Sequence, residues 1–387
     1  MNASPLRPRA RDAVPAARHR RRRAPSRRAP SRRAPSRASS FVAFPSRSPF
    51  VCFAALMALV ALAALAGCRS TGASDELLNV SYDPTRELYE EYNAWFAARH
   101  EQQTGRRLRI EMSHGGSGRQ ARSVIDGLAA DVVTLALEPD IQALVDHGAF
   151  VAPDWKQALP HNAAPYTSTQ VFIVRRGNPR GIRTWDDLVR EDVSVIVPNP
   201  RTSGGARWIY VAAWGWALRQ PGGTEASARD FVARLYGNVP VLDSGARGST
   251  TTFARNGIGD VLVSWENEAH LLTREMPDQG FEVVVPPASV LCEPPVAVVG
   301  RNADRRGTRE LATAYLSALY EPEAQQIAAR HGYRPRDPEV LAAHADRFPP
   351  LELFRVEDVL GSWDVVQREH FADGGVFDRI HVPGGRR

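Results

Sequence analysis

The sequence predicts an α/β protein with two lobes, in which parallel-rich sheets are flanked by helices. Three short runs of small residues each follow a predicted strand and precede a predicted helix: SHGGSG (Ser113–Gly118), TSGGA (Thr202–Ala206) and DSGARGST (Asp243–Thr250). Alternation of strands and helices is typical of parallel sheets covered by helices. About 320 residues follow a basic leader, which is too many for one modest core and fits two lobes.

The first lobe is expected to begin with a strand at Leu77–Tyr82. Asp83 would then cap a helix that has Pro84 at its first position, because proline fits the first turn. Further strands are expected at 108–112, before SHGGSG, and at 131–137. Apolar residues of the first helix recur at helical spacing: Leu88, Tyr92, Trp95 and Phe96.

The second lobe is expected to repeat this plan. Strands at 193–197 and 239–242 lead into TSGGA and DSGARGST, a helix covers 206–218, and a strand at 260–264 resembles the earlier one at 131–137. Ligands of open α/β sheets bind beyond the carboxyl ends of the strands. The small-residue loops of both lobes would therefore face one cleft.

Two extended runs, 166–175 and 295–299, are candidate crossings between the lobes. If both cross, the first lobe is discontinuous and includes the final helices, with Leu311, Tyr315 and Leu319 on one apolar face and a new helix beginning at Pro322. The predicted divisions are a leader (1–67), a linker (68–75), the first part of lobe 1 (76–165), lobe 2 (166–294) and the second part of lobe 1 (295–387).

Charge separates the leader from the rest of the chain. The full chain is formally +6, but residues 1–67 hold 14 arginines and one acid, so the remainder is −7. The leader has an Arg/Pro/Ser/Ala tract that is expected to be disordered. An uncharged stretch at 50–67 follows and ends in small residues before Cys68. This pattern is typical of an export signal, although a membrane anchor is the alternative.

Leu65-Ala66-Gly67-Cys68 resembles the lipobox of bacterial lipoproteins, so Cys68 is expected to carry lipid and tether the protein in the periplasm. Cys52 would leave with the signal, and Cys292 alone cannot close an internal disulfide. We interpret Cys292 as a small buried apolar residue. The Arg tract has no aromatic residues interleaved before Phe41, and we expect no nucleic-acid binding.

The small-residue loops predict a cradle of hydrogen-bond donors. The first NH groups of a helix have no partner inside the helix and favour a compact oxyanion, and glycine lets the anion approach the backbone. Any one such loop is more often an ordinary turn. Their repetition before helices supports the functional interpretation.

Eight segments resemble, in the same order, the sulfate- and thiosulfate-binding proteins of bacterial ABC importers. The resemblance covers nearly all of the mature chain and implies the two-lobed periplasmic binding protein fold of type II, which closes on one oxyanion. The segments are SYDPTRELYEEYN (81–93), SHGGSGRQ (113–120), ADVVTLAL (130–137), APYTSTQVFIVRRGNP (164–179), NPRTSGGARW (199–208), LDSGARGSTTTF (242–253), GDVLVSWENE (259–268) and GYRPRD (332–337).

The resemblance also implies which groups bind sulfate or thiosulfate. These are the backbone NH groups of Asp83, Ser117, Gly204, Gly205 and Ala246, the hydroxyl of Ser203 and the indole NH of Trp265. A carboxylate facing a dianion would repel it, so we expect the Asp83 carboxylate to turn away and cap its own helix. Trp265 taken alone would more often be a core residue.

The resemblance implies delivery to a membrane permease powered by a cytoplasmic ATPase. We expect a monomer without catalytic residues, metal or cofactor. Two alternatives stay open: an exported serine hydrolase using Ser117, Ser203 or Ser244, none of which lies in a G-x-S-x-G elbow, and a sulfate sensor without a transport role. Arg119 and Thr202 depart mildly from the family pattern.

Several neighbours of the loops are given structural roles. His114 is expected to support its loop, because no companion catalytic group is visible in the sequence. Arg247 would either attract the anion at long range or have a solvated or salt-bridged side chain. Glu266 and Glu268 are expected to point away from the ligand.

Overall fold

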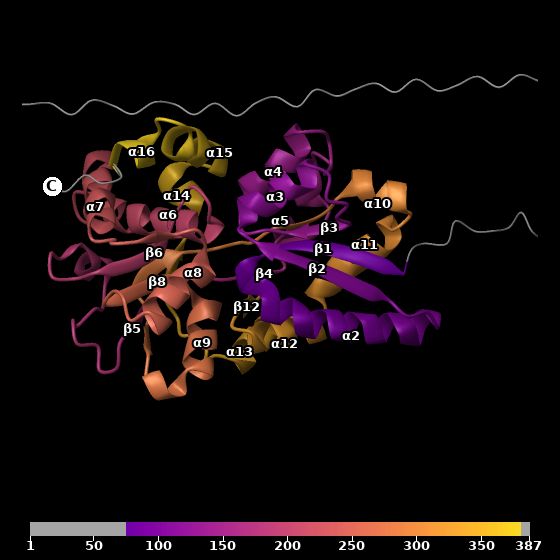
Figure 1. Ribbon diagram of the computed structural model, residues 1–387, viewed down its shortest axis with the longest axis horizontal. Coiled ribbons are helices and arrows are strands. Elements are labelled where there is room, and N and C mark those ends of the chain that lie inside the picture. The colour runs from indigo at the N-terminus through magenta and orange to yellow at the C-terminus, as the bar shows by residue number, and fades with distance from the viewer. Residues whose placement is uncertain (1–74, 381–387) are drawn as a thin grey trace, which may run out of the picture. The chain divides into compact units, whose positions relative to one another are not determined.

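The computed structural model describes residues 75–380, so the leader 1–67 and Cys68 lie outside the described residues. Two sheets organise this part of the chain (Figure 1), and each defines a lobe. The first lobe is built on a four-stranded sheet of order β11-β3-β1-β2. Its strands are β1 (Glu76–Tyr82), β2 (Arg109–Gly115), β3 (Val132–Thr134) and β11 (Val296–Val298).

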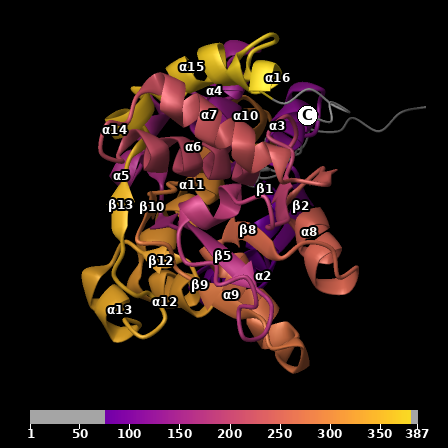
Figure 2. The ribbon, with the colours of Figure 1, turned by 90° about the vertical axis from the view of Figure 1, so that its left-hand side faces the viewer.

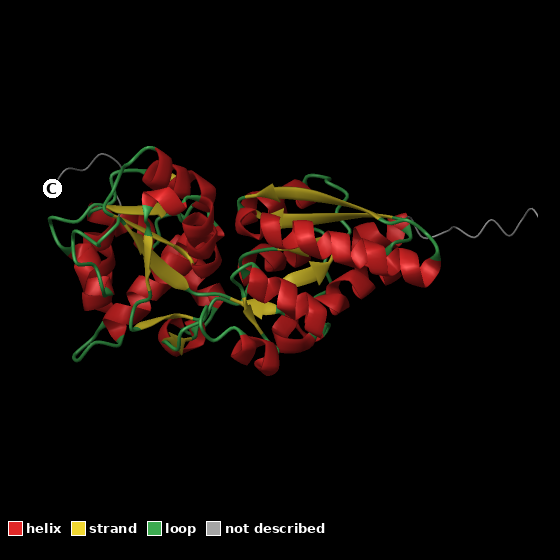
Figure 3. Ribbon diagram, turned by 90° about the horizontal axis from the view of Figure 1, so that it is seen from below, coloured by secondary structure: helices red, strands yellow, loops and turns green. Residues whose placement is uncertain are grey.

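The second lobe is built on a five-stranded sheet of order β7-β6-β8-β5-β9. Its strands are β5 (Gln170–Val174), β6 (Val195–Pro198), β7 (Leu242–Asp243), β8 (Val261–Trp265) and β9 (Glu282–Val284). Figure 3 shows the two groups of strands with helices around each.

Both sheets are mixed, with a parallel centre. β1 is parallel to β2 and β3, and β6 is parallel to β7 and β8. The antiparallel members are β11, which pairs with β3, and β5, which pairs with β8 and β9. These two strands lie in the two predicted crossings, 166–175 and 295–299. Each enters its sheet from the other lobe and runs antiparallel to the strand beside it.

Helices of the first lobe follow the predicted apolar spacing. Leu88, Tyr92 and Phe96 are buried on α2, which ends at Gly105 in the left-handed conformation (φ 71°), as is common after helices. The helices of this lobe are η1 (Asp83–Thr85), α2 (Arg86–Thr104), α3 (Ser117–Ile125), α4 (Glu138–Asp146), η2 (Trp155–Gln157), α5 (Pro160–Ala163), α10 (Gly300–Arg306), α11 (Arg309–Ser317), η6 (Ala318–Tyr320), α12 (Pro322–Arg330) and α13 (Pro338–Ala343).

In the second lobe, α6 (Gly204–Leu218) is buried around most of its circumference, as expected of a helix covered on several sides. The other helices before the C-terminal segment are η3 (Trp185–Val189), α7 (Glu225–Gly237), α8 (Ala246–Thr250), η4 (Thr251–Arg255), α9 (Glu266–Glu275) and η5 (Pro277–Gln279).

The C-terminal segment differs from its expected grouping with lobe 1. Its elements are β13 (Glu352–Phe354), α14 (Val356–Leu360), α15 (Trp363–Val365), η7 (Val366–Phe371) and α16 (Val376–Ile380). They share the hydrophobic core of the second lobe, and α14 and α16 contact α6 and α7, respectively (Figure 2). Apolar spacing shows that a helix has a buried face but does not say which sheet covers it.

This packing requires a third crossing. β12 (Arg334–Pro335) pairs with β4 (Tyr166–Thr167), and β13 then pairs with β10 (Ala288–Val290). Cys292 is buried beside the first crossing and exchanges backbone hydrogen bonds with Ser168, which confirms that it is a buried residue. Between residues 75 and 380 no helix has both the length and the apolar content to cross a membrane.

Candidate functional site

The seven ligand-binding residues expected from the sequence line one small cavity where the two lobes meet. The cavity is small: the space open to the centre of a water molecule there is about 10 Å³, close to the minimum that one water molecule needs. Every wall follows the carboxyl end of a strand. The lining residues are Tyr82, Asp83, Pro84, Gly115, Gly116, Ser117, Ala136, Ser203, Gly204, Gly205, Gly245, Ala246 and Trp265.

In the first lobe, Ser117 is the first residue of α3, and extended Gly116 precedes it. Its hydroxyl donates to the carboxylate of Asp140 and accepts from the backbone NH of Ala136 at 2.9 Å. The side chain therefore fixes α3 against the loop after β3. The backbone NH of Ser117, in the first turn of the helix, has no partner within the helix.

Asp83 lies in the cavity wall, but its side chain does not cap its own helix as we expected. η1 begins at Asp83 itself, Tyr82 occupies the cap position, and that cap has no side-chain hydrogen bond. Because Asp83 already lies within the first turn, its carboxylate turns instead to Arg86, whose Nη2 lies 3.3 Å from Oδ1. The backbone NH of Asp83 remains at the amino end of η1.

In the second lobe, Ser203 is the cap residue of α6. Its Oγ accepts from the backbone NH of Ala206 at 3.3 Å, so the hydroxyl proton is free to be donated to a ligand. Gly204 and Gly205 form the first turn. A Cβ on Gly205 would lie 2.4 Å from Nε1 of Trp265, which explains why this position needs glycine.

The remaining donors of the second lobe come from α8 and β8. Ala246 is the first residue of α8, and extended Gly245 precedes it. Trp265 ends β8, is 1% exposed, and packs its ring 5.5 Å from that of Tyr82. Its indole Nε1 is buried and has no hydrogen-bond partner among residues 75–380. An acceptor in the cavity would satisfy it.

No arginine, lysine or histidine is among the residues that line the cavity. Arg247 follows Ala246 but forms ion pairs with Glu87 at 2.6 Å and Glu268 at 3.2 Å, which confirms the salt-bridge interpretation. Glu266 pairs with Arg334 at 2.7 Å. As expected, neither Glu266 nor Glu268 lines the cavity.

Burial changes the titration of two groups beside the site. It raises the pKa of Glu268 from 4.5 to about 7, although Arg247 opposes the shift. It also lowers the pKa of His114, and the charge of Arg86 acts in the same direction. His114 is therefore neutral at pH 7 and, like the cavity itself, adds no positive charge.

The two halves of the cavity are held together by contacts that the sequence did not reveal. Trp208 Nε1 donates to the carbonyl oxygen of Ala136 at 2.8 Å, and Asn267 Nδ2 donates to that of Pro84 at 3.2 Å. Ala136 and Gly116 also line the cavity without having been predicted. Their positions, two residues after β3 and directly after β2, were the available signal.

The sequence matches the model of a known protein family. The model for bacterial extracellular solute-binding proteins matches residues 79–334. The chain belongs to this family. Its SHGGSG, TSGGA and DSGARGST loops all fall within the matched region.

Similar proteins come from several bacteria. The sulfate-binding protein of Escherichia coli is 55% identical over 82% of this chain and 96% of its own length. The thiosulfate-binding protein of Pseudomonas aeruginosa is 52% identical over 80% and 93%. The solved structure of the sulfate-binding protein SubI from Mycobacterium tuberculosis aligns with a TM-score of 0.68 and 35% identity, covering 77% of this chain and 99% of SubI. The two-lobed binding-protein fold predicted from the sequence is thus confirmed.

Proposed function

We propose that this family member captures sulfate, with thiosulfate as an alternative guest, in the cavity between its lobes. The observation that carries the proposal is the buried indole NH of Trp265, which has no partner among the described residues and lines a cavity without cations. The names of the similar proteins agree with it. The ligand would accept hydrogen bonds from Asp83, Ser117, Gly204, Gly205 and Ala246 NH groups, the Ser203 hydroxyl and Trp265.

Neutral donors can hold a dianion. A helix amino end carries about half an elementary charge, and hydrogen bonds to an ion are about twice as strong as neutral ones. α3 and α6 both begin at the cavity. Neutral donors also release the anion readily, because an unpaired buried cation would be costly when the lobes part.

Selection against phosphate would depend on one proton. Sulfate at pH 7 has only acceptor oxygens, whereas hydrogen phosphate carries a proton that needs an acceptor. The one carboxylate in the wall, that of Asp83, pairs with Arg86 through Oδ1, and the proposal requires that it does not accept from the ligand. An unmet buried polar group costs about 1–3 kcal/mol, so phosphate should bind more weakly.

Delivery and location form the second part of the proposal. The protein would pass its anion to a membrane permease driven by a cytoplasmic ATPase, as a monomer tethered in the periplasm through lipid on Cys68. Family membership and the leader sequence support this assignment. Mass spectrometry of the purified protein tests the lipid: unmodified Cys68, or cleavage elsewhere, would contradict it.

Calorimetry of the purified protein with sulfate, thiosulfate and phosphate at pH 6 to 8 tests the binding proposal. We expect sulfate affinity to be constant over this range and phosphate to bind at least about tenfold more weakly, the equivalent of 1.4 kcal/mol. Equal affinities for sulfate and phosphate would refute the role of the proton. No binding of any of the three would refute the proposed function.

Two other functions make different predictions. A serine hydrolase would need a base beside its nucleophile, but among residues 75–380 no histidine is hydrogen-bonded to Ser117, Ser203 or Ser244. Hydrolysis of a generic ester that is abolished by Ser203→Ala would support that function. A sensor role would be supported if gene deletion abolished the response to sulfate but left sulfate uptake intact.

A further inference from the structure

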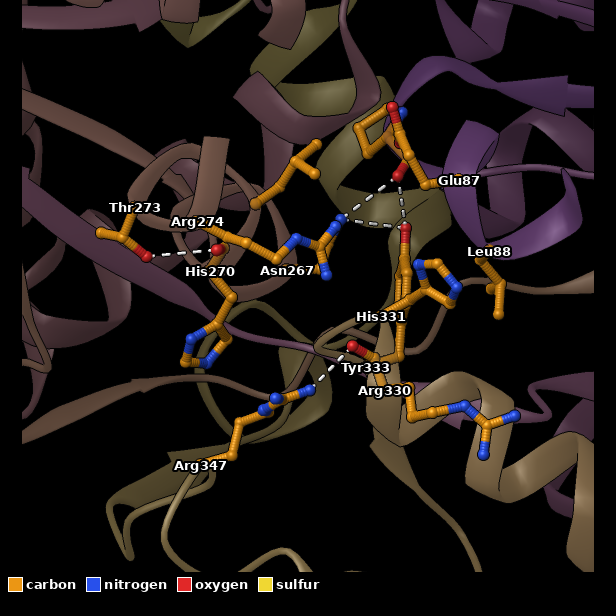
Figure 4. Close-up of a pocket in the computed structure, with 12 residues that line it drawn as sticks. Glu87, Leu88, Asn267, His270, Thr273, Arg274, Arg330, His331, Tyr333 and Arg347 are labelled. Carbon is orange, nitrogen blue, oxygen red and sulfur yellow. Dashed lines mark hydrogen bonds between the residues drawn. The ribbon is translucent and has the colours of Figure 1, made fainter. Parts of the chain in front are cut away.

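A second cavity, of about 320 Å³, lies between the lobes and adjoins the anion cavity, with which it shares Pro84. One wall is a face of α9 in the second lobe, formed by residues at helical spacing that include Asn267, His270 and Arg274. The other lining residues belong to the first lobe: Pro84 and the start of α2, the end of α12 with the chain that follows it, and Arg347 (Figure 4). This volume is typical of sites for small organic molecules.

Two cations in this cavity have no carboxylate partner. Arg274 makes no ion pair or side-chain hydrogen bond with residues 75–380, and Arg347 donates only to the carbonyl oxygens of Ala329 and Arg330, at 2.9 and 2.7 Å. The other basic groups in the wall, Arg330 and His331, are paired with Glu91. The uncompensated charge is therefore concentrated on Arg274 and Arg347.

Two buried acceptors on α9 also have no partner among the described residues. Asn267 donates through Nδ2 to Pro84 and to Tyr333, which leaves Oδ1 unpaired. His270 has an unpaired Nε2. Burial, aided by the charges of Arg347 and Arg334, lowers the pKa of His270 to about 4 while a hydrogen bond with the Arg347 backbone opposes the shift. The ring is therefore neutral at pH 7, and with its proton on Nδ1 it can accept a hydrogen bond at Nε2.

In Figure 4 the side chains of His270, Arg274 and Arg347 lie around the same open space. Guanidinium groups bind carboxylates well, because both groups are planar and form paired hydrogen bonds. The unpaired acceptors, in contrast, require a hydroxyl or similar donor. Inorganic sulfate lacks such a donor, so it would leave His270 and Asn267 unsatisfied.

We propose that this cavity binds a hydroxylated polycarboxylate, with carboxylates on Arg274 and Arg347 and a hydroxyl donating to His270 or Asn267. Citrate has this chemistry and is the probe. Since the walls come from both lobes, citrate would favour the arrangement that also completes the anion cavity. Each ligand would then increase the affinity of the other, and this linkage alone rests on the proposed function.

Calorimetry of the sulfate-saturated protein, in which the anion cavity is blocked, tests direct binding. Citrate is compared with tricarballylate, which has the same three carboxylates but no hydroxyl. We expect saturable citrate binding and an affinity at least about tenfold lower for tricarballylate. No saturable binding of citrate up to about 10 mM would overturn the site. Equal affinities of the two compounds would overturn the role assigned to the α9 acceptors.

Arg274→Gln is expected to lower citrate affinity at least about tenfold, while sulfate affinity without citrate stays unchanged and shows that the variant is folded. Arg255→Gln is the matched control, because Arg255 is also exposed but does not line the cavity. Unchanged citrate affinity in Arg274→Gln would overturn the proposal. If the protein bound no sulfate, the same titration on ligand-free protein would still test the citrate site separately.

Discussion

Among the proposed donors, the indole nitrogen of Trp265 is the one whose lack of a partner points most directly to a ligand. The indole lies at the end of β8, is almost fully buried, and leaves Nε1 without a partner in the described chain. A buried donor without an acceptor costs about 1–3 kcal/mol, so a protein that keeps one at a cavity wall gains from a ligand that accepts there. Sulfate binding would recover this free energy.

Trp265→Phe removes the donor and keeps most of the ring. We expect it to lower sulfate affinity by about 10- to 100-fold, the range for a hydrogen bond to a charged group, as measured by calorimetry. Trp216→Phe is a matched control, because the Trp216 indole donates to Asp186 at the surface instead. Equal affinity in Trp265→Phe and the parent protein would show that the indole does not contact the anion.

The contacts of the site residues could be predicted only in part. Glycine and serine before helices indicated where backbone donors lie, and all the residues expected from the family pattern line the same cavity. The predicted orientation of the Asp83 side chain was wrong. The helix begins at Asp83, one residue earlier than expected, so Asp83 lies in the first turn and Tyr82 occupies the cap position. The partners of Ser117 could not be predicted either, since Ala136 lies in the loop after β3 and Asp140 lies in α4.

Helix α9 carries two buried carboxylates, those of Glu266 and Glu268. Glu266 accepts two hydrogen bonds from Arg334, at 2.7 and 2.8 Å, whereas Glu268 has Arg247 at 3.2 Å and one oxygen without a hydrogen-bond partner among the described residues. Burial consequently dominates at Glu268 and raises its pKa to about 7. The folded protein retains a proton there that an unfolded chain would release near pH 4.5.

Glu268→Gln should change how stability depends on pH. Because the folded-state pKa is raised, the Glu268 contribution to the unfolding free energy decreases as pH rises from about 4.5 to about 7. Glutamine does not titrate, so the unfolding free energy of the variant does not decrease in this way. Relative to the parent, it should therefore increase between pH 4.5 and pH 7, by at most about 3 kcal/mol. Urea unfolding at several pH values measures the difference.

The matched control is Glu275→Gln, which changes an exposed carboxylate on the same helix. Because the charge of Glu275 is the smallest of the causes that raise the pKa of Glu268, this variant should change the pH dependence of stability much less than Glu268→Gln does. A difference that stays constant with pH for Glu268→Gln would mean that Glu268 titrates normally. Comparing each variant with the parent cancels the opposite trend expected from His270 and His370, whose pKa values are lowered to about 4.

Elements with strong local signals were predictable, whereas their partners were less so. The TSGGA turn and the apolar run after it predicted α6, which begins at Gly204. Helices α14 to α16 were grouped with the wrong lobe, because Trp363 and Phe371 pack on α6 through contacts more than a hundred residues apart in the chain. Local periodicity does not encode such distant pairings.

At the scale of the whole molecule, closure requires backbone to approach backbone across the cavity. A Cβ on Gly204, in the second lobe, would lie 2.7 Å from the Cβ of Ala136 in the first. A Cβ on Gly116, in the first lobe, would lie 2.7 Å from the carbonyl oxygen of Thr202 in the second. Both glycines therefore let the lobes come together, and neither has a positive φ that would require glycine for its own conformation.

Gly204→Ala should therefore weaken sulfate binding without unfolding the protein. Alanine suits the first turn of α6 and keeps its backbone NH, but its methyl group would have to displace Ala136 when the lobes close. Overpacking of this kind costs about 1–3 kcal/mol, which predicts sulfate affinity lowered by about 5- to 150-fold, while the melting temperature of the ligand-free protein changes little. Gly116→Ala should reproduce this from the opposite lobe, whereas Gly237→Ala, which meets no atom within 4 Å, should leave affinity unchanged. If Gly204→Ala bound sulfate as tightly as the parent, the anion would not require the lobes to meet at this contact, and the cavity between them would not be its site.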